Sequence, residues 1–227
     1  MNKLLVHEIA GFRVVRGDLV AGGIKSLALE LALSKIKESK VACAVHEFGH
    51  SGLALALAAE KCGKEVHLFW AGKPNITYIT EHLKSFSNIQ SHSVDGFEKQ
   101  HEMGNFVKNW AKENKAFHLP IGFNCELFRN ELINIAKETI SSPKEVWVMV
   151  GSGTTIACLR EAWPSTKING VNLGFLNHDN VEFTVHEKAD EIAEEFPPYP
   201  SALFYDAKIW RFVKKYASKG AVIWNIA

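Results

Sequence analysis

A lysine that follows two glycines is the first side chain in this sequence suited to covalent chemistry. Gly22 and Gly23 precede Lys25 in the stretch 16–30, and an apolar run typical of a helix follows at once. Lys25 would project from the first turn of that helix, where burial and the positive helix N-terminus both favour the neutral amine. A neutral amine attacks carbonyl carbon atoms, so Lys25 is a candidate for forming a Schiff base. The alternative is a solvated lysine after an ordinary Gly-Gly turn, and the stretch taken alone favours that alternative.

A second loop is suited to binding an anion. The apolar strand expected over 145–150 leads directly into Gly151, Ser152, Gly153, Thr154 and Thr155, and a helix is expected to follow. The glycines allow successive N–H groups to point at one anion, while the hydroxyls and the helix N-terminus add donors. The loop lacks the lysine of a Walker motif and the third glycine of the dinucleotide pattern. The alternative is an ordinary turn with a Ser/Thr cap, but a carbonyl-reactive lysine and a site for one phosphate are together what pyridoxal phosphate requires.

Composition limits the classes of protein to consider. The chain has 227 residues, 47% of them hydrophobic, which suits one large domain or two lobes sharing a core. A formal net charge of +1 argues against general attraction to nucleic acid or anionic lipid. The four cysteines have no CxxC spacing, so neither a zinc site nor a disulfide framework is indicated. With no signal peptide or membrane span recognisable at the N-terminus, we expect a cytoplasmic protein.

Strands and helices alternate along the chain, which predicts an α/β fold with an open, mostly parallel sheet and helices on both faces. The expected strands are 4–7, 12–16, 41–45, 66–70, 116–120, 145–150, 168–173 and 221–224. The expected helices are 25–40, 53–62, 76–86, 98–114, 126–139, 156–163, 185–196 and 206–218. Residues 71–115 are more polar and less regular. The last helix carries a basic face (Lys208, Arg211, Lys214, Lys215 and Lys219) that is either solvated or able to bind an acidic partner.

Several blocks of the sequence resemble the fold type II pyridoxal-phosphate enzymes, the tryptophan synthase beta-like superfamily. The nearest branch is that of 1-aminocyclopropane-1-carboxylate deaminase and D-cysteine desulfhydrase. The blocks are 16–30, 49–63, 150–159, 205–208 and 221–225, and they occur in the family's order. The resemblance implies a single, shortened pyridoxal-phosphate-enzyme-like unit over 1–227. It also implies a small lobe of about 41–120 packed on a large lobe of about 1–40 plus 121–227.

The resemblance also assigns roles to individual residues. Lys25 matches the lysine that holds pyridoxal 5'-phosphate as an aldimine, and 151–155 match the phosphate-binding loop. His50 stands where the family has an asparagine on the cofactor's phenolic oxygen, and Asn225 stands near the pyridine nitrogen. Tyr205 matches an active-site tyrosine, and Ser51 is a candidate donor to substrate or cofactor. In place of the loop that grips a substrate carboxylate, this chain has Glu47, which would repel such a group unless paired or turned away.

The function implied by the resemblance is that of a pyridoxal-phosphate-dependent lyase or deaminase. Its substrate would be a small amino acid or amine, undergoing deamination, β-elimination or decarboxylation at Cα, and its assembly a homodimer. One alternative is a phage-type enzyme that modifies an amino-acid-substituted thymine base in DNA. A second is a non-catalytic regulatory protein that binds pyridoxal phosphate or another phosphorylated ligand. A third is a phosphosugar- or nucleotide-binding α/β protein without a Schiff base. No metal is expected.

Overall fold

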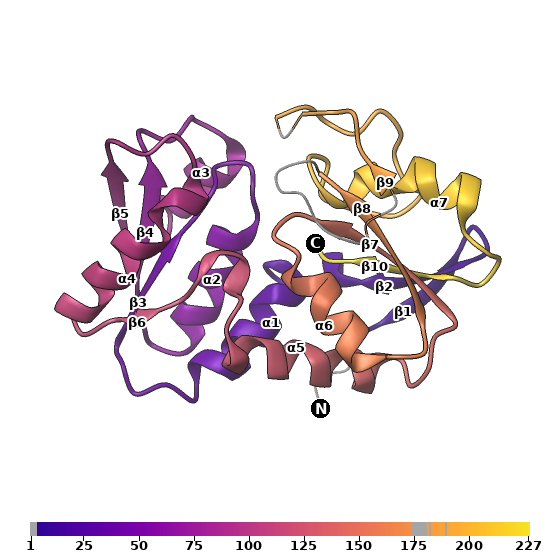
Figure 1. Ribbon diagram of the computed structural model, residues 1–227, viewed down its shortest axis with the longest axis horizontal. Coiled ribbons are helices and arrows are strands. Elements are labelled where there is room, and N and C mark those ends of the chain that lie inside the picture. Colours follow the sequence, from indigo (N-terminus) through magenta and orange to yellow (C-terminus); the bar gives the residue numbers. More distant parts are fainter. Residues whose placement is uncertain (1–3, 174–180, 182, 189) are drawn as a thin grey trace. The chain divides into compact units, whose positions relative to one another are not determined.

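The computed structural model describes residues 4–173, 181, 183–188 and 190–227, and the chain forms two compact units (Figure 1). Unit 1 comprises Met1–Ile24 and Asn130–Ala227, and unit 2 comprises Lys25–Arg129. The divisions between the units therefore fall at 24/25 and 129/130, whereas the sequence places the lobe boundaries near 40/41 and 120/121. Within the described part of the chain, no helix combines the length and apolar character needed to cross a membrane.

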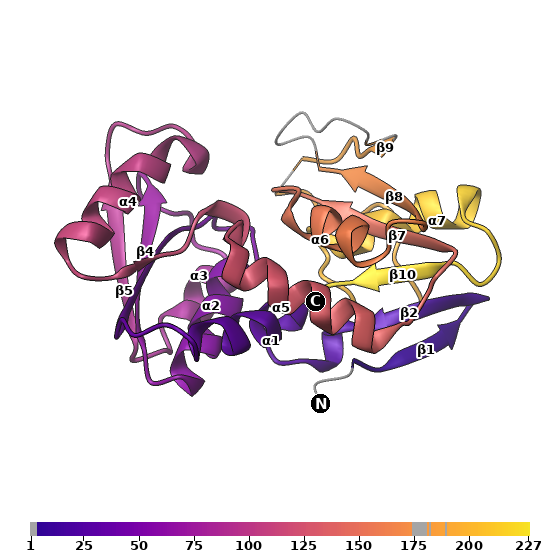
Figure 2. The same ribbon diagram turned by 60° about the horizontal axis from the view of Figure 1, so that its bottom comes forward.

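Unit 1 contains a six-stranded sheet in the order β1-β2-β10-β7-β8-β9. Its strands are β1 (Val6–Ile9), β2 (Phe12–Arg16), β10 (Val222–Asn225), β7 (Glu145–Val150), β8 (Lys167–Asn172) and β9 (Phe183–Thr184). Only the β1–β2 pair is antiparallel among these neighbours. The carboxyl ends of β2, β10, β7 and β8 consequently meet at one edge of the sheet (Figure 2).

The central strand β7 is buried along its whole length, as expected for an apolar strand covered on both faces. Trp147 and Met149 share a hydrophobic core with Ile209, Trp210 and Val213. These last residues belong to the 3₁₀ turn η4 (Asp206–Ile209) and to helix α7 (Trp210–Tyr216). On β10, Trp224 instead packs edge-on against Trp163, the residue directly after helix α6 (Thr154–Ala162), with 5.8 Å between the ring centroids.

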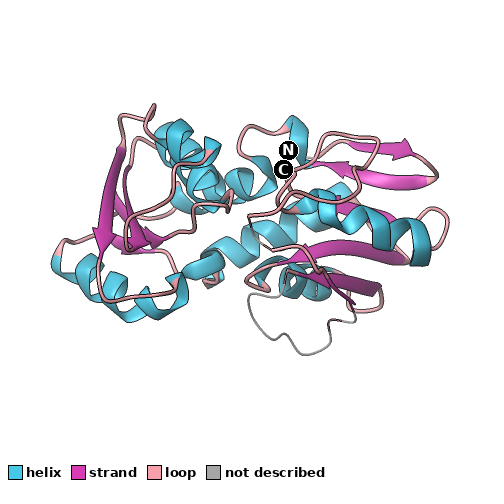
Figure 3. Ribbon diagram, turned by 90° about the horizontal axis from the view of Figure 1, so that it is seen from above, coloured by secondary structure: helices cyan, strands magenta, loops and turns pink. Residues whose placement is uncertain are grey.

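Unit 2 contains a parallel four-stranded sheet in the order β5-β4-β3-β6. The strands are β5 (Ile89–Val94), β4 (Glu65–Ala71), β3 (Lys40–Ala44) and β6 (Phe117–His118). Helices lie on both sides of it (Figure 3). They are α2 (Ser51–Lys61), α3 (Tyr78–Leu83) and α4 (Gly104–Glu113). Helices α1 (Gly23–Leu33) and α5 (Glu126–Thr139) begin in one unit and continue in the other.

Opposite faces of the unit 2 sheet pack against different helices. Ala42 and Phe69 form a core with Val107 of α4 and with Met103, which ends the turn η2 (Gln100–Met103). On the other face, α2 approaches β4 closely at Gly52, where an added Cβ would lie 3.8 Å from Leu68 Cδ1. The alanine-rich sequence of α2 suits this close packing, since small side chains allow a helix to lie near a sheet.

The prediction of a helix over 185–196 is wrong. The described residues of that stretch form no helix, and Arg211 contacts both Glu187 and Glu194, which lie seven residues apart in the chain. Its apolar residues do not form one buried helical face: Val185 and Ala193 are buried, whereas Ile192 is 50% exposed and Phe196 is 54% exposed. Glutamate is a good helix former, but ion pairs with α7 and the hydrogen bond from Ala193 N to Leu203 O hold this segment in another conformation.

Strand β5 was not predicted, because its sequence is apolar only at the two ends. Four polar residues lie between Ile89 and Val94, and the strand occupies the edge of the sheet, where one side stays exposed. The ranges expected for α5 and β7 agree with the structure to the residue. The amphipathic pattern of α5 and the uninterrupted apolar run of β7 are strong local signals.

A cluster of aromatic rings lies beside α4 in unit 2. His67 Nδ1 and His92 Nε2 are 3.0 Å apart, and the His67 ring centroid lies 4.5 Å from that of Trp110. Burial lowers the pKa of both histidines below the ordinary value. Because unfolding exposes these rings, the unfolded chain binds more protons than the folded chain just below the unperturbed histidine pKa of about 6.5.

We therefore expect stability to be complete above about pH 6.5 and to fall as the pH decreases toward the lowered pKa values of His67 and His92. Each histidine contributes at most about 1.4 kcal/mol per pH unit to this slope. His92→Gln should make the slope shallower, as measured by urea unfolding between pH 7 and 5. Ser93→Ala, an exposed non-titrating change on the same strand, serves as the control. Equal slopes in wild type and His92→Gln would contradict the assignment.

A second prediction concerns Gly17, which begins the 3₁₀ turn η1 (Gly17–Leu19). A Cβ at this position would lie 2.3 Å from the carbonyl oxygen of Asn225 and 2.4 Å from that of Ile226. Gly17→Ala should therefore destabilise the protein by about 1–3 kcal/mol or more, because two backbones must separate. Gly104→Ala is the matched control, since nothing lies within 4 Å of its added Cβ. Chemical denaturation compares the two, and equal stability would contradict the close approach.

Candidate functional site

The carboxyl edge of the unit 1 sheet gathers several chain segments from distant parts of the sequence. Arg16 at the end of β2 pairs with Asn225 at the end of β10, and β10 in turn pairs with β7. The chain leaves these strands through η1, through Ile226 and through the loop that begins at Gly151. Ligands of open α/β sheets bind outside the carboxyl ends of the strands, so a ligand site is expected at this edge.

The start of α1 is held at this same edge. Ile24 N donates to Ile226 O at 2.8 Å, and a Cβ on Gly23 would lie 2.4 Å from that oxygen. Gly23 also has φ +77°, a conformation that glycine adopts without strain. Lys25 is the next residue after Ile24 and stands in the first turn of α1, as the sequence predicts. Lys25 is the first residue of unit 2, to which His50 and Ser51 also belong.

The loop 151–155 joins β7 to α6 in unit 1. Gly153 has φ +82° and immediately precedes the first residue of α6. Thr154 is 3% exposed, Thr155 is 6% exposed, and Ser152 Oγ lies 3.4 Å from Thr154 Oγ1. The donor set consists of hydroxyls and the first N–H groups of a nine-residue helix, with no carboxylate in the loop. This chemistry fits a phosphate group.

Tyr205 lies against the end of β7 and the first residue of the loop 151–155. Its hydroxyl donates to Met149 O at 3.3 Å, and a Cβ added to Gly151 would lie 3.2 Å from that hydroxyl. Burial raises the pKa of Tyr205, and the charge of Asp206 raises it further. The hydroxyl therefore stays protonated at neutral pH. The structure brings Tyr205 together with the loop, while its catalytic role stays a prediction.

Asn225 is buried in a polar network at the end of β10. Its Nδ2 donates to Asp18 Oδ1 and to Pro200 O, both at 3.1 Å, and its Oδ1 accepts from Ser201 Oγ at 2.7 Å. Asp18 is held in turn by Arg16, with N–O distances of 2.6 and 2.8 Å. The Asn225 side chain thus connects the end of β10 with η1 and with residues 200–201. A contact between Asn225 and a cofactor ring nitrogen stays a prediction.

His50 and Ser51 stand at the start of α2 in unit 2, with Ser51 as its first residue. Burial lowers the pKa of His50, and the positive charge of Lys25 lowers it further. Lys25 and His50 are therefore near enough to interact within unit 2, and His50 is neutral at physiological pH. The hydroxyl of Tyr78 forms a hydrogen bond with His50 Nε2.

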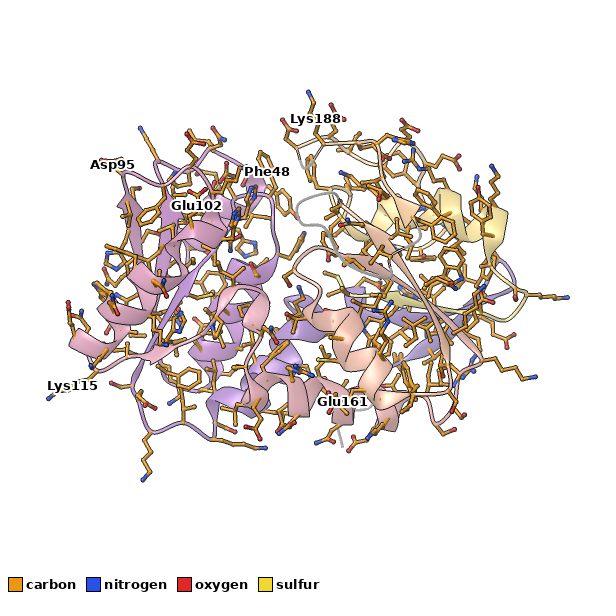
Figure 4. The ribbon with its side chains drawn as sticks, in the orientation of Figure 1. Phe48, Asp95, Glu102, Lys115, Glu161 and Lys188 are labelled. Carbon is orange, nitrogen blue, oxygen red and sulfur yellow. The ribbon has the colours of Figure 1, made fainter. Side chains whose placement is uncertain are left out.

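Glu47 is paired within unit 2. Asn75 Nδ2 donates to Glu47 Oε1 at 2.8 Å, and Thr77 Oγ1 donates to the Glu47 carbonyl at 2.9 Å. The neighbouring residue Phe48, labelled in Figure 4, donates its backbone N–H to His46 Nδ1 at 3.3 Å. The loop before α2 is thus held by contacts with the segment that precedes α3.

The basic face expected on the last helix is largely neutralised within unit 1. Arg211 pairs with Glu187 at 2.9 Å and with Glu194 at 2.8 Å, and Lys214 pairs with Glu195. Lys208 is 1% exposed, and its Nζ donates to the carbonyl of Lys188, labelled in Figure 4, at 2.6 Å. These three positions present no free row of positive charge to nucleic acid.

Sequence reasoning missed Tyr78, Asn75 and Asp18. Tyr78 and Asn75 are each 28 residues from their partners, and Asp18 is 207 residues from Asn225. No local pattern signals such contacts. In the part of the chain that the structure describes, no group of three or more His, Cys, Asp or Glu residues is arranged to hold a metal ion.

Comparison with known proteins identifies the fold. No protein-family model and no curated protein matches the sequence. The solved structure of an ACC deaminase homologue is 15% identical, with a TM-score of 0.74, over 99% of this chain and 89% of that one. Serine racemase from Dictyostelium discoideum is 13% identical, with a TM-score of 0.64, over 99% and 91% of the two chains. A pyridoxal 5'-phosphate-dependent aspartate racemase is 11% identical, with a TM-score of 0.59, over 98% and 74%. The chain has the fold of the fold type II pyridoxal-phosphate enzymes, as the sequence resemblance predicted.

The donor set of loop 151–155 leads to a direct prediction. Inorganic phosphate should raise the melting temperature, because a ligand that binds only the folded state stabilises it. Thr154→Val removes one hydroxyl with little change of volume and should weaken phosphate binding about tenfold, the cost of a hydrogen bond to a charged group. Titration calorimetry measures the affinity. Thr184→Val, at an exposed position on β9, is the control. Unchanged affinity in Thr154→Val would remove this hydroxyl from the phosphate site.

Proposed function

We propose that this chain is a pyridoxal-phosphate-dependent enzyme that acts on a small amino acid or amine. The main support is the position of Lys25 one residue after Ile24, whose N–H is bonded to Ile226 at the edge where loop 151–155 also begins. Lys25 supplies an amine, and the loop supplies donors for one phosphate. The fold, shared with the solved structures above, supports the same assignment.

Each residue that would hold the cofactor is proposed to bind a different chemical group of it. Loop 151–155 would bind the phosphate, and Lys25 Nζ would condense with the aldehyde with loss of water. When bound, pyridoxal phosphate delocalises the negative charge that develops as a bond to Cα breaks. Burial, the largest cause, lowers the pKa of His50, so the neutral ring would donate a hydrogen bond without adding a positive charge. Asn225 remains the proposed neighbour of the pyridine nitrogen.

Lys25 is the proposed proton-transfer group. With a substrate amine in its place on the cofactor, Lys25 Nζ would take a proton from Cα or return one. Tyr205 keeps its proton because burial raises its pKa, so it would act as a donor rather than a base. Ser51 is the second proposed donor. Deamination and β-elimination are the proposed reactions, with decarboxylation as an alternative fate of the same Cα bonds.

The alternatives receive less support. A DNA-modifying enzyme would gain affinity from unpaired basic side chains, but Arg211 and Lys214 are engaged by glutamates of the same unit. A non-catalytic cofactor-binding protein is separated from an enzyme by whether amino acids alter the spectrum of the loaded protein. A cytoplasmic location and a homodimer are part of the proposal.

The decisive test replaces Lys25 by arginine, which keeps the positive charge but does not condense with the aldehyde. Wild-type protein mixed with pyridoxal phosphate should show a visible absorption band and, after borohydride reduction, a cofactor label on Lys25. Lys25→Arg should lose both. Spectroscopy and peptide mass spectrometry provide the measurements.

Lys37→Arg, the same change at an exposed lysine, should behave as wild type. A wild-type protein that stays colourless with pyridoxal phosphate, or a Lys25→Arg protein that is still labelled, would overturn the proposal. If labelling occurs but neither D- nor L-amino acids perturb the spectrum, the protein binds the cofactor without acting on free amino acids.

A further inference from the structure

The segment that leads into α3 is built to hold Tyr78 in one place. Thr77 caps the helix: its hydroxyl accepts from Thr80 N at 3.1 Å, and Thr80 Oγ1 accepts from Thr77 N at 2.8 Å. Tyr78 is the first residue of α3, directly after this cap. Such reciprocal capping fixes the direction in which the helix begins, and therefore the position of its first side chains.

The same segment is joined to the loop before α2 at three successive points. Asn75 binds the Glu47 carboxylate, Thr77 binds the Glu47 carbonyl, and Tyr78 binds His50 Nε2. All of these residues lie in unit 2. The contact between Tyr78 and His50 is thus the last of a series, made by two segments already held together, and is not an isolated surface contact.

The direction of the hydrogen bond follows from the chemistry of its partners. A neutral imidazole has one N–H donor and one acceptor nitrogen. A phenol, with an unperturbed pKa of about 10, is a far better proton donor than a neutral imidazole N–H. Burial raises the pKa of Tyr78 and lowers that of His50, so both groups are neutral at physiological pH. The favourable arrangement has the Tyr78 hydroxyl donating and His50 Nε2 accepting.

We propose that Tyr78 is a positioning residue for His50: its hydroxyl donates to Nε2, so the ring carries its proton on Nδ1 and offers that N–H to a ligand bound at Lys25. The electrostatic interaction between Lys25 and His50 supports the nearness of such a ligand. The tautomer assignment stands on the contacts within unit 2, whereas the identity of the ligand rests on the proposed function. Tyr78 itself is not required to touch the ligand.

The test of the tautomer uses the protein without cofactor. Long-range ¹H–¹⁵N spectra distinguish a histidine protonated on Nδ1 from one protonated on Nε2, and His50→Gln identifies the His50 signals. In wild type we expect the Nδ1-protonated form of His50 at pH 7.5. In Tyr78→Phe, which keeps the ring and removes the hydroxyl, the population of that form should fall, with the Nε2-protonated form gaining.

The matched control is Tyr216→Phe, because Tyr216 is 48% exposed and Tyr78 is 51% exposed. Melting curves of both variants should resemble that of wild type, which shows that any spectral change is local. A wild-type His50 protonated on Nε2, or an unchanged tautomer in folded Tyr78→Phe, would overturn the inference.

A second measurement connects the pair to the cofactor. Tyr78→Phe should weaken pyridoxal phosphate binding about 3- to 10-fold, the effect of one misaligned hydrogen bond, and shift the absorption band while Lys25 is still labelled. In a His50→Gln background, Tyr78→Phe should have no further effect on either readout. An additional loss in that background would mean that Tyr78 acts independently of His50. Failure of wild type to bind the cofactor would remove the proposed function and leave the tautomer result intact.

Discussion

The carbonyl of Ile226 is the point on which the proposed site depends most. It accepts from Ile24 N, and added Cβ atoms at Gly17 and at Gly23 would each lie 2.4 Å from it. The segment 17–24 and the C-terminal Ile226, which are far apart in sequence, therefore meet where glycines at 17 and 23 leave enough room. Lys25 follows directly after this contact, so backbone packing rather than a flexible turn sets the start of its backbone.

Each unit contributes a different kind of constraint. In unit 1, the parallel strands place the phosphate-type loop and the Asn225 network at the same edge of one sheet. In unit 2, the capped start of α3 holds the loop before α2 through Glu47 and His50. The departures from the family pattern at Glu47 and His50 are thus accompanied by partners: Asn75 binds Glu47 Oε1, and Tyr78 binds His50 Nε2.

The features of the fold and of the candidate site that are encoded by neighbouring residues were predicted correctly. Lys25 in a first helical turn and the hydroxyl-rich loop after β7 follow from glycine placement and apolar runs. Sequence reasoning failed over 185–196, where helix-forming acidic residues serve as ion-pair partners for Arg211 instead. The polar partners of the site were also missed, because Tyr78, Asn75 and Asp18 meet their neighbours across 28 to 207 residues of chain. Tertiary contacts of this kind leave no periodic trace in a single sequence.

The interaction between Lys25 and His50 has a thermodynamic consequence. Because the positive charge of Lys25 lowers the pKa of His50, any reaction that neutralises Lys25 must raise the proton affinity of the ring. A change in the charge of Lys25 is therefore expected to appear as a change in the titration of the His50 ring.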